Sequence, residues 1–268
     1  MQRDYKNFKK ELGQNFLRNQ EVVLDMIEAL EPLPEDVVLE IGPGTGALTQ
    51  YIISSVKHIV LVEFDNELVQ RLTETYAMYP NVTLIHGDIL LQDLKAIQKD
   101  FGVNKVIGAL PYNISKKIVM NVSGQPDLVF QRAVFMLQKE VAFEYLPAVK
   151  KHSLLENYFS QMNDITHVVT AEKSSFVPVP KVDSAAIRMD RKPVAEIELK
   201  SDEFQNYYTF LQKIFNNPRK KLTKNLKTYY SKYNWEEYYK QVGFKPEIRI
   251  EELLPAQVLV IFRFVHAA

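Results

Sequence analysis

A short, mostly apolar run that ends at a cluster of glycines constrains the fold of this chain more than any other feature. Val37–Ile41 is typical of a strand, the cluster Gly42-Pro43-Gly44-Thr45-Gly46 follows it, and Ala47–Ile53 has the pattern of a helix. Glycines at such a turn let the backbone approach a ligand closely, and the start of the next helix offers unpaired N–H groups. The sequence therefore predicts a cofactor cleft at this turn.

Strand and helix patterns alternate along the chain up to about residue 190. Further strands are expected at His58–Val62, Asn81–Ile85, Lys105–Ile107, Ala133–Leu137 and Ser184–Met189. Strands separated by helices predict an α/β fold with a doubly wound, mostly parallel sheet of the Rossmann-like kind.

After Pro193 the pattern becomes helical, with one apolar face formed by Phe204, Tyr207, Phe210, Leu211 and Ile214. We therefore predict one domain over residues 1–193 and a small α-helical domain over residues 194–268. With 268 residues, 46% of them hydrophobic, the chain is long enough to build a core in each domain.

The composition argues against several classes of protein. The chain contains no cysteine, which excludes disulfides, thiolate ligands and cysteine nucleophiles, and its five histidines show no metal-ligand spacing. No apolar run reaches the roughly 20 residues that span a bilayer, and Asn15 and Arg18 interrupt the region where a signal peptide would have its apolar core. We expect a cytoplasmic protein with no metal site and no membrane partner.

Positive charge is concentrated in one part of the chain, although the formal net charge is zero. The stretch from Lys213 to Lys227 contains no acidic residue and carries the cations Lys213, Arg219, Lys220, Lys221, Lys224 and Lys227. Such a run is expected to form a patch that contacts nucleic-acid phosphates. A solvated helix face is the alternative explanation.

The glycine cluster by itself is compatible with more than one ligand. It also satisfies the dinucleotide fingerprint, and a tight turn without any ligand would need the same glycines. Glu63 ends the second strand 19 residues after Gly44, where a carboxylate can accept hydrogen bonds from ribose hydroxyls. Asp88 follows the third strand, where it is placed to accept from an adenine amino group with Ile89 beside the ring. This spacing favours a nucleoside ligand.

A series of short motifs stands in the order found in one protein family. They are Leu12-Gly13-Gln14-Asn15-Phe16-Leu17, Glu40–Gly46, Glu63, Gly87-Asp88, Leu110-Pro111-Tyr112-Asn113-Ile114-Ser115, Met136–Glu140, Phe176–Ala185, Arg219–Leu222 and Arg249–Leu253. Together they resemble the KsgA-type ribosomal RNA adenine dimethyltransferases, relatives of the Erm methyltransferases, over nearly the whole chain. Phe176–Ala185 and the helical tail favour the KsgA branch.

The resemblance implies a class I methyltransferase domain at 1–193 that binds S-adenosylmethionine and a helical domain at 194–268 that binds RNA or the ribosome. Small-subunit ribosomal RNA is the implied partner, and the implied state is a monomer. Cofactor contacts are implied at Gln14, Asn15, Leu17, Glu40, Gly42, Gly44, Glu63, Phe64, Asp88, Ile89 and Ala109. RNA contacts are implied at Arg219, Lys220, Lys221 and Lys224.

The resemblance also assigns catalytic positions to Ala109, Leu110, Tyr112 and Phe176. Because the lone pair of adenine N6 is delocalised into the ring, methyl transfer needs acceptors for the amine hydrogens. In the family an Asn side chain and the carbonyl of the next Leu supply them. Tyr112 would stack on the flipped base, with Phe176 against its other side. Without the resemblance, both aromatic rings are expected in the core.

Ala109 departs from the family, which has Asn-Leu-Pro-Tyr where this chain has Ala109-Leu110-Pro111-Tyr112. The alanine removes an acceptor at the reacting centre, a change that typically lowers a rate on the order of 100- to 1000-fold. The chain is then either a nearly inactive relative or one in which the alanine was introduced to trap a bound state. Compensation by the amide of Asn113 is a further alternative.

A second departure lies at Lys151–Leu155, where the family has Tyr-Gly-Arg-Leu-Ser, so we expect a different fit to RNA. Two functions of different classes follow. The first is an RNA adenine N6-dimethyltransferase weakened by Ala109, and the second is a ribosome-assembly or RNA-binding factor of the same fold that does little chemistry. A dehydrogenase is a more distant alternative, which the motifs at Leu110–Tyr112 and Phe176–Ala185 disfavour.

Overall fold

The computed structural model describes residues 14–266, which pack as two compact units. The first unit contains residues 14–143 and Asp164–Arg191, and the second contains Glu144–Asn163 and residues 192–266. This division differs from the predicted boundary between residues 193 and 194. Glu144–Asn163 packs with the C-terminal helices because its helix buries aromatic side chains against them, and a single boundary cannot describe a chain that leaves a unit and returns to it.

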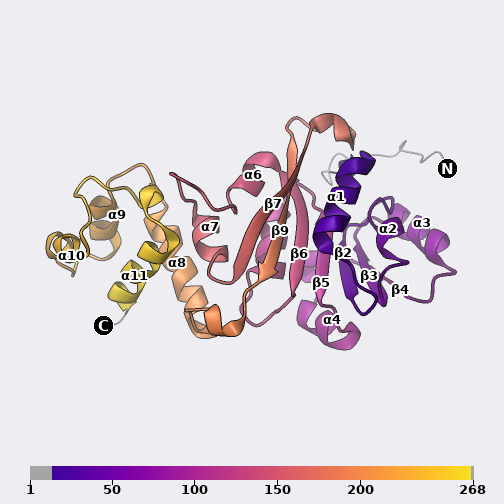
Figure 1. Ribbon diagram of the computed structural model, residues 1–268, viewed down its shortest axis with the longest axis horizontal. Helices are drawn as coiled ribbons and strands as arrows, with labels where there is room; N and C mark the ends of the chain where they lie inside the picture. Colours follow the sequence, from indigo (N-terminus) through magenta and orange to yellow (C-terminus); the bar gives the residue numbers. More distant parts are fainter. Residues whose placement is uncertain (1–13, 267–268) are drawn as a thin grey trace. The chain divides into compact units, whose positions relative to one another are not determined.

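The first unit is built on a seven-stranded sheet in the order β4-β3-β2-β5-β6-β9-β7 (Figure 1). Its strands are β2 (Val37–Ile41), β3 (His58–Glu63), β4 (Val82–His86), β5 (Lys105–Ala109), β6 (Arg132–Gln138), β7 (Asn163–Ala171) and β9 (Ser184–Arg191). Strands β2 to β6 are parallel, and β9 runs antiparallel to β6. The predicted doubly wound, mostly parallel sheet is therefore confirmed.

The strand order indicates where the ligand crevice lies. From β2 the chain adds β3 and β4 on one side, and then returns to add β5 and β6 on the other side. In open α/β sheets, ligands bind outside the carboxyl ends of the strands where the order reverses in this way. The loops after β2 and β5 are therefore expected to form the centre of the site.

A small second sheet closes one side of this crevice. Strand β1 (Phe16–Leu17) pairs antiparallel with β8 (Phe176–Val177), so that Leu17 lies opposite Phe176. Asn19 then caps α1 (Gln20–Leu30), because its side chain accepts a hydrogen bond from the N–H of Glu21. Leu12 and Gly13, which begin the N-terminal family motif, lie outside the described residues.

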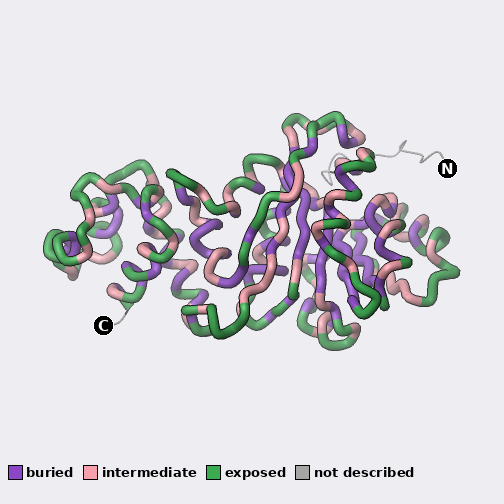
Figure 2. Tube along the Cα trace, viewed as in Figure 1, coloured by how far each residue is buried: buried purple, intermediate pink, exposed green. Residues whose placement is uncertain are grey.

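The other helical segments of the first unit are α2 (Thr49–Ile52), α3 (Asn66–Tyr76), η2 (Ile89–Leu91), α4 (Leu94–Phe101), α5 (Ser115–Ser123), α6 (Lys139–Phe143) and η3 (Lys173–Ser175). Helix α1 packs on β5, β6 and β9, and its apolar face joins the main core, which Figure 2 shows as buried chain. Helix α2 is shorter than the predicted Ala47–Ile53, because Gly42, Gly44 and Gly46 have positive φ and hold the preceding residues in a turn.

The second unit contains α7 (Leu154–Phe159), η4 (Val194–Glu196), η5 (Ser201–Glu203), α8 (Phe204–Ile214), α9 (Leu222–Tyr229), α10 (Trp235–Val242), η6 (Ile250–Glu252) and α11 (Pro255–His266). All five apolar positions predicted on one helix face are buried on α8. Edge-to-face contacts of Phe262 with Tyr207 and Phe210 join α8 to α11. No helix within residues 14–266 is long and apolar enough to cross a membrane.

The segment that departs from the family at Lys151–Leu155 has a structural role in the second unit. Ser153 and Glu156 form a capping box at the start of α7. His152 is 5% exposed, its Nδ1 lies 2.9 Å from Glu156 Oε1, and its backbone N–H donates to Glu251 O at 2.7 Å. These contacts anchor the segment to η6, and its expected effect on RNA fit stays a prediction.

Candidate active site

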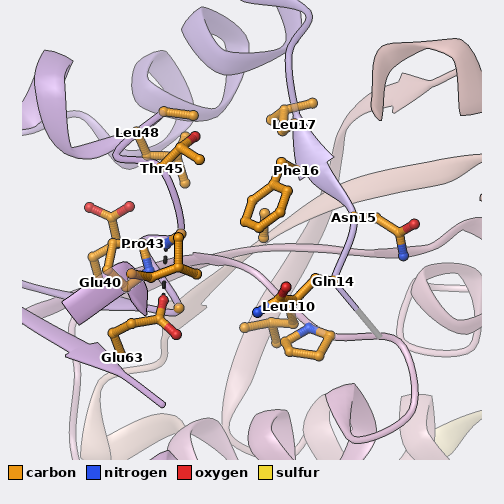
Figure 3. A pocket seen from close by; sticks show the side chains of 16 residues that line it. Gln14, Asn15, Phe16, Leu17, Glu40, Pro43, Thr45, Leu48, Glu63 and Leu110 are labelled. Atoms are coloured by element: carbon orange, nitrogen blue, oxygen red, sulfur yellow. Dashed lines mark hydrogen bonds between the residues drawn. The ribbon is translucent and has the colours of Figure 1, made fainter. Parts of the chain in front are cut away.

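Two adjoining hollows occupy the carboxyl edge of the sheet at the reversal point. Hollow 1, of about 680 Å³, lies between the glycine loop after β2, the strand β1 and the end of β5 (Figure 3). Hollow 2, of about 710 Å³, lies beside the ends of β3 and β4. The two share Gln14, Gly42, Glu63 and Pro111, so one extended ligand can occupy both.

The glycine loop forms one wall of hollow 1. Gly44 has a φ of +58°, and a Cβ built there would lie 3.0 Å from the ring of Phe16. A side chain at Gly44 would therefore be strained and would also collide with the opposite wall, which Figure 3 shows across the hollow. The glycine lets the main chain of the loop, rather than a side chain, border the ligand space.

Glu63 lies where the two hollows meet and is 6% exposed. Its Oε1 accepts hydrogen bonds from the N–H groups of Phe64 and Asp65, both at 2.9 Å. Its Oε2 accepts from the N–H of Gly44 at 3.1 Å, the bond drawn in Figure 3. Each carboxylate oxygen has two lone pairs, so Oε2 retains one for a ligand hydroxyl. Burial raises the pKa of Glu63, and the three backbone bonds oppose that shift.

Glu40 is the second acid at hollow 1 and is 1% exposed. The hydroxyl of Thr49 donates to Glu40 Oε2 at 2.7 Å. Burial raises the pKa of Glu40 to about 8, because a charge there would lose its hydration with one side-chain hydrogen bond in return. Glu40 is therefore mostly protonated at neutral pH in the ligand-free protein.

Hollow 2 combines an exposed ring, an apolar wall and a carboxylate. Phe64 is 56% exposed, and Ile89 lies on the wall formed by η2. Asp88 caps η2 through Oδ1, which accepts from the N–H of Leu90 at 2.9 Å. Its other oxygen, Oδ2, has no hydrogen bond within the described chain. The hollow thus offers two apolar surfaces and one acceptor to a planar, amino-bearing ring.

Ala109 and Leu110 form a further wall of hollow 1 at the end of β5. Ala109 pairs with Met136 on β6, and the N–H of Leu110 donates to Met136 O at 3.1 Å. The carbonyl of Leu110 accepts no hydrogen bond from residues 14–266. Asn113, the side chain considered as a substitute acceptor, lines hollow 2, whereas Ala109 lines hollow 1.

The two predicted stacking residues differ in accessibility. Tyr112 is half-buried, and its hydroxyl lies 2.5 Å from Ser184 Oγ. Phe176 is 1% exposed, belongs to the main core cluster and lines neither hollow. Its pairing opposite Leu17 directs the ring into the core. In this conformation the ring is a core residue, and the stacking of Phe176 on a base stays a prediction.

The basic residues predicted from the sequence lie together in the second unit. Arg219, Lys220, Lys221 and Lys224 are exposed, and the three lysines line hollow 3. The rest of this lining is polar or aromatic and consists of Asn216, Asn217, Asn225, Thr228 and Tyr229. Lys221 forms an ion pair with Glu247, which is 71% exposed in its side chain. No acidic residue of the described chain lines hollow 3, so the hollow suits an anion.

Comparison with known proteins decides the family. A sequence profile of the ribosomal RNA adenine dimethylase family matches residues 5–267. The chain belongs to this family. One relative, the ribosomal RNA small subunit methyltransferase A of Malacoplasma penetrans, is 34% identical over 246 residues, which cover 91% of this chain and 87% of the relative.

Two solved structures have the same class I methyltransferase fold. A dimethyladenosine transferase from Plasmodium falciparum has a TM-score of 0.77 at 23% identity and covers 93% of this chain and 98% of its own. The 23S rRNA methyltransferase ErmE has a TM-score of 0.73 at 24% identity and covers 94% of this chain and 99% of its own.

Every residue predicted from the family resemblance to contact the cofactor lines hollow 1 or hollow 2. The sequence reasoning missed Thr45, which lies inside the glycine cluster on the wall of hollow 1. It also missed Gly108, where a Cβ would lie 2.8 Å from the carbonyl of Ile41, so that this glycine lets β5 approach the end of β2 closely. Their positions, between loop glycines and directly before Ala109, were the available signals.

Proposed function

We propose that this chain binds S-adenosylmethionine across hollows 1 and 2 and presents it to an adenosine N6 of small-subunit ribosomal RNA, with methyl transfer strongly reduced by Ala109. The observation that carries the proposal is the convergence of Glu63, Asp88 and the Ala109–Leu110 wall on two adjoining hollows. The family to which the chain belongs, and the name of its relative from Malacoplasma penetrans, supply the substrate class.

The free polar atoms of the hollows fit this cofactor. The remaining lone pair of Glu63 Oε2 suits a ribose hydroxyl, and Asp88 Oδ2 suits the adenine amino group beside Phe64 and Ile89. The hydroxyl of Thr45 is buried without a partner inside the described chain, as expected of a group whose partner is a ligand. When bound, S-adenosylmethionine supplies an electrophilic methyl group.

The acceptor wall has one of the two groups that the family uses. The free carbonyl of Leu110 can accept one hydrogen of the target amine, while the methyl group of Ala109 accepts none. The nitrogen lone pair is then released less completely from the ring and directed less firmly at the methyl group. We expect the chemical step to be slower by about 100- to 1000-fold, or about 3 to 4 kcal/mol.

Tyr112 and hollow 3 would hold the RNA. The ring of Tyr112, held at its hydroxyl by Ser184, would stack on the flipped adenine. Lys220, Lys221 and Lys224 would contact phosphates in the second unit. These contacts depend on the second unit and on Tyr112, and they do not depend on the residue at position 109.

The experiment is transfer of labelled methyl from S-adenosylmethionine to unmethylated small ribosomal subunits, measured for the chain and for its Ala109→Asn variant. Calorimetry measures cofactor binding by both. We expect weak transfer by the chain, a gain of about 100-fold or more in the variant and similar cofactor affinities. Robust transfer by the unaltered chain would show that Leu110 and its neighbours suffice, and would contradict the role given to Ala109.

A ribosome-assembly or RNA-binding factor is the second candidate. The presence of Glu63 and Asp88 in the hollows beside an apolar position 109 favours it, because such a protein needs binding without chemistry. If Ala109→Asn binds S-adenosylmethionine and small subunits but transfers no methyl, this second function is the better account.

A further inference from the structure

Tyr112 is held both at its backbone and at the tip of its ring. Its hydroxyl lies 2.5 Å from Oγ of Ser184, and its backbone carbonyl accepts a hydrogen bond from the hydroxyl of Ser115 at 3.3 Å. Burial raises the pKa of Tyr112, so the contact with Ser184 joins two neutral hydroxyls. A tyrosine bound at its tip keeps one ring orientation, whereas the last side-chain torsion of a free tyrosine is broad.

Ser184 is itself held in place by the sheet and by the residue before it. It is fully buried and begins β9 opposite Gln138, the last residue of β6. The carbonyl of Asp183 accepts a hydrogen bond from the N–H of Lys139, and its Oδ1 accepts one from the N–H of Lys173, both at 3.0 Å. Asp183 and Ser184 therefore join the end of β6, the segment before β8 and the loop after β5.

Three of the sequence motifs meet at this junction. They are Leu110–Ser115, Met136–Glu140 and Phe176–Ala185. Neither Tyr112 nor Ser184 lines hollow 1 or hollow 2, so contacts with a cofactor in these hollows do not explain the bond between the two side chains. Placement of the Tyr112 ring for the second substrate, the target base, does explain it.

Stacking on a flipped base requires a ring whose plane is already set. A ring that must first be immobilised reduces the population of the stacked state by about 2- to 10-fold. A side chain held by a neighbour on a rigid strand avoids this loss, because its rotamer is fixed before the ligand arrives. A hydroxyl on a buried residue at the start of β9 is such a neighbour.

We propose that Ser184 is a positioning residue for methyl transfer, which sets the ring plane of Tyr112 for stacking on the target adenine through the bond between their hydroxyls. The inference rests on the proposed function. Ser184 acts through Tyr112 and touches no reacting atom. Because the base stacks only after the RNA has docked, loss of this bond lowers kcat and kcat/KM by the same factor and leaves KM unchanged.

The test is a double-mutant cycle on methyl transfer to unmethylated small ribosomal subunits, in the Ala109→Asn background. Ser184→Ala and Tyr112→Phe each remove one hydroxyl of the pair. We expect each to lower kcat by about fivefold with the KM for subunits unchanged, and the double variant to be no slower than either single variant. Affinity for S-adenosylhomocysteine, measured by calorimetry, should be the same in all of them.

Ser123→Ala, which removes another buried serine hydroxyl at the end of α5, is the control. Thermal unfolding is measured for each variant, and Ser123→Ala should keep kcat even if it lowers the melting temperature as much as Ser184→Ala does. Independent losses that multiply to about 25-fold in the double variant, or a kcat that neither single variant changes, would overturn the positioning role and leave the proposed function standing. Absence of any transfer by Ala109→Asn would overturn the proposed function and the positioning role with it.

Discussion

The two walls of hollow 1 differ in how many polar groups they offer to a ligand. The donor side, formed by the glycine loop with Glu63, offers a lone pair and the unpartnered hydroxyl of Thr45. The acceptor side, formed by Ala109 and Leu110, offers one main-chain carbonyl and a methyl group. Under the proposed function, cofactor binding depends mainly on the donor side and methyl transfer on the acceptor side, so one can be lost while the other is kept.

The largest effect on the donor side of hollow 1 is expected at Glu63, and it tests whether the two walls act independently. Glu63→Ala leaves three backbone N–H groups without their acceptor and removes the expected ribose contact. We expect cofactor affinity to fall by about 100-fold, both in the chain and in an Ala109→Asn background. Calorimetry with S-adenosylhomocysteine measures this, and Glu74→Ala on the exposed face of α3 is the control. Unequal losses in the two backgrounds would show that the walls are coupled.

The stability of the protein should depend on pH through Glu40, which also lines hollow 1. Burial raises its pKa from 4.5 to about 8, so between these values the folded protein holds a proton that the unfolded chain has released. The free energy of unfolding therefore falls as the pH rises through this window, by about 2 kcal/mol between pH 6 and 8. Urea unfolding of the chain and of Glu40→Gln measures the difference. An equal pH slope in both would remove Glu40 as the cause.

Substitution of Tyr112 tests whether binding of the target base is separate from binding of the cofactor. In the Ala109→Asn background, Tyr112→Ala removes the expected stacking on the target base, and we expect methyl transfer to fall by about 10-fold at low RNA concentration. Tyr112→Phe keeps the ring and loses only the contact with Ser184. Its rate of methyl transfer should therefore lie between the rates with Tyr112 and with Tyr112→Ala. Affinity for S-adenosylhomocysteine should stay unchanged in both variants. A matching loss of cofactor affinity would place Tyr112 on the donor side.

The smallest effect is expected in the second unit. Replacing Lys220 and Lys224 by alanine removes two cations from hollow 3 and should weaken binding to small ribosomal subunits by about fivefold, with a shallower dependence on salt. Lys240→Ala, an exposed position on α10 outside hollow 3, is the control. Equal losses for the double variant and for Lys240→Ala would reduce the role of hollow 3 to general surface charge.

Much of the fold follows from local patterns. The apolar runs predicted the parallel strands β2, β3, β5 and β6 and the antiparallel strand β9 to within two residues at each end, because buried strands are short and nearly continuous in apolar residues. Strand β7 (Asn163–Ala171) was missed, since its mixture of buried and exposed positions does not form a continuous apolar run. The paired strands β1 and β8 were also missed, because two-residue strands have no period to detect.

The sequence by itself determined the strands β2, β3, β5, β6 and β9, the glycine turn, the resemblance to the family and the absence of an amide at position 109. Each of these depends on residue type and spacing along the chain. The tertiary structure decided that Phe176 is buried opposite Leu17, that Glu144–Asn163 belongs to the second unit and that the hydroxyl of Thr45 has no partner inside the described chain. These properties depend on contacts between residues distant in sequence, which local spacing does not specify.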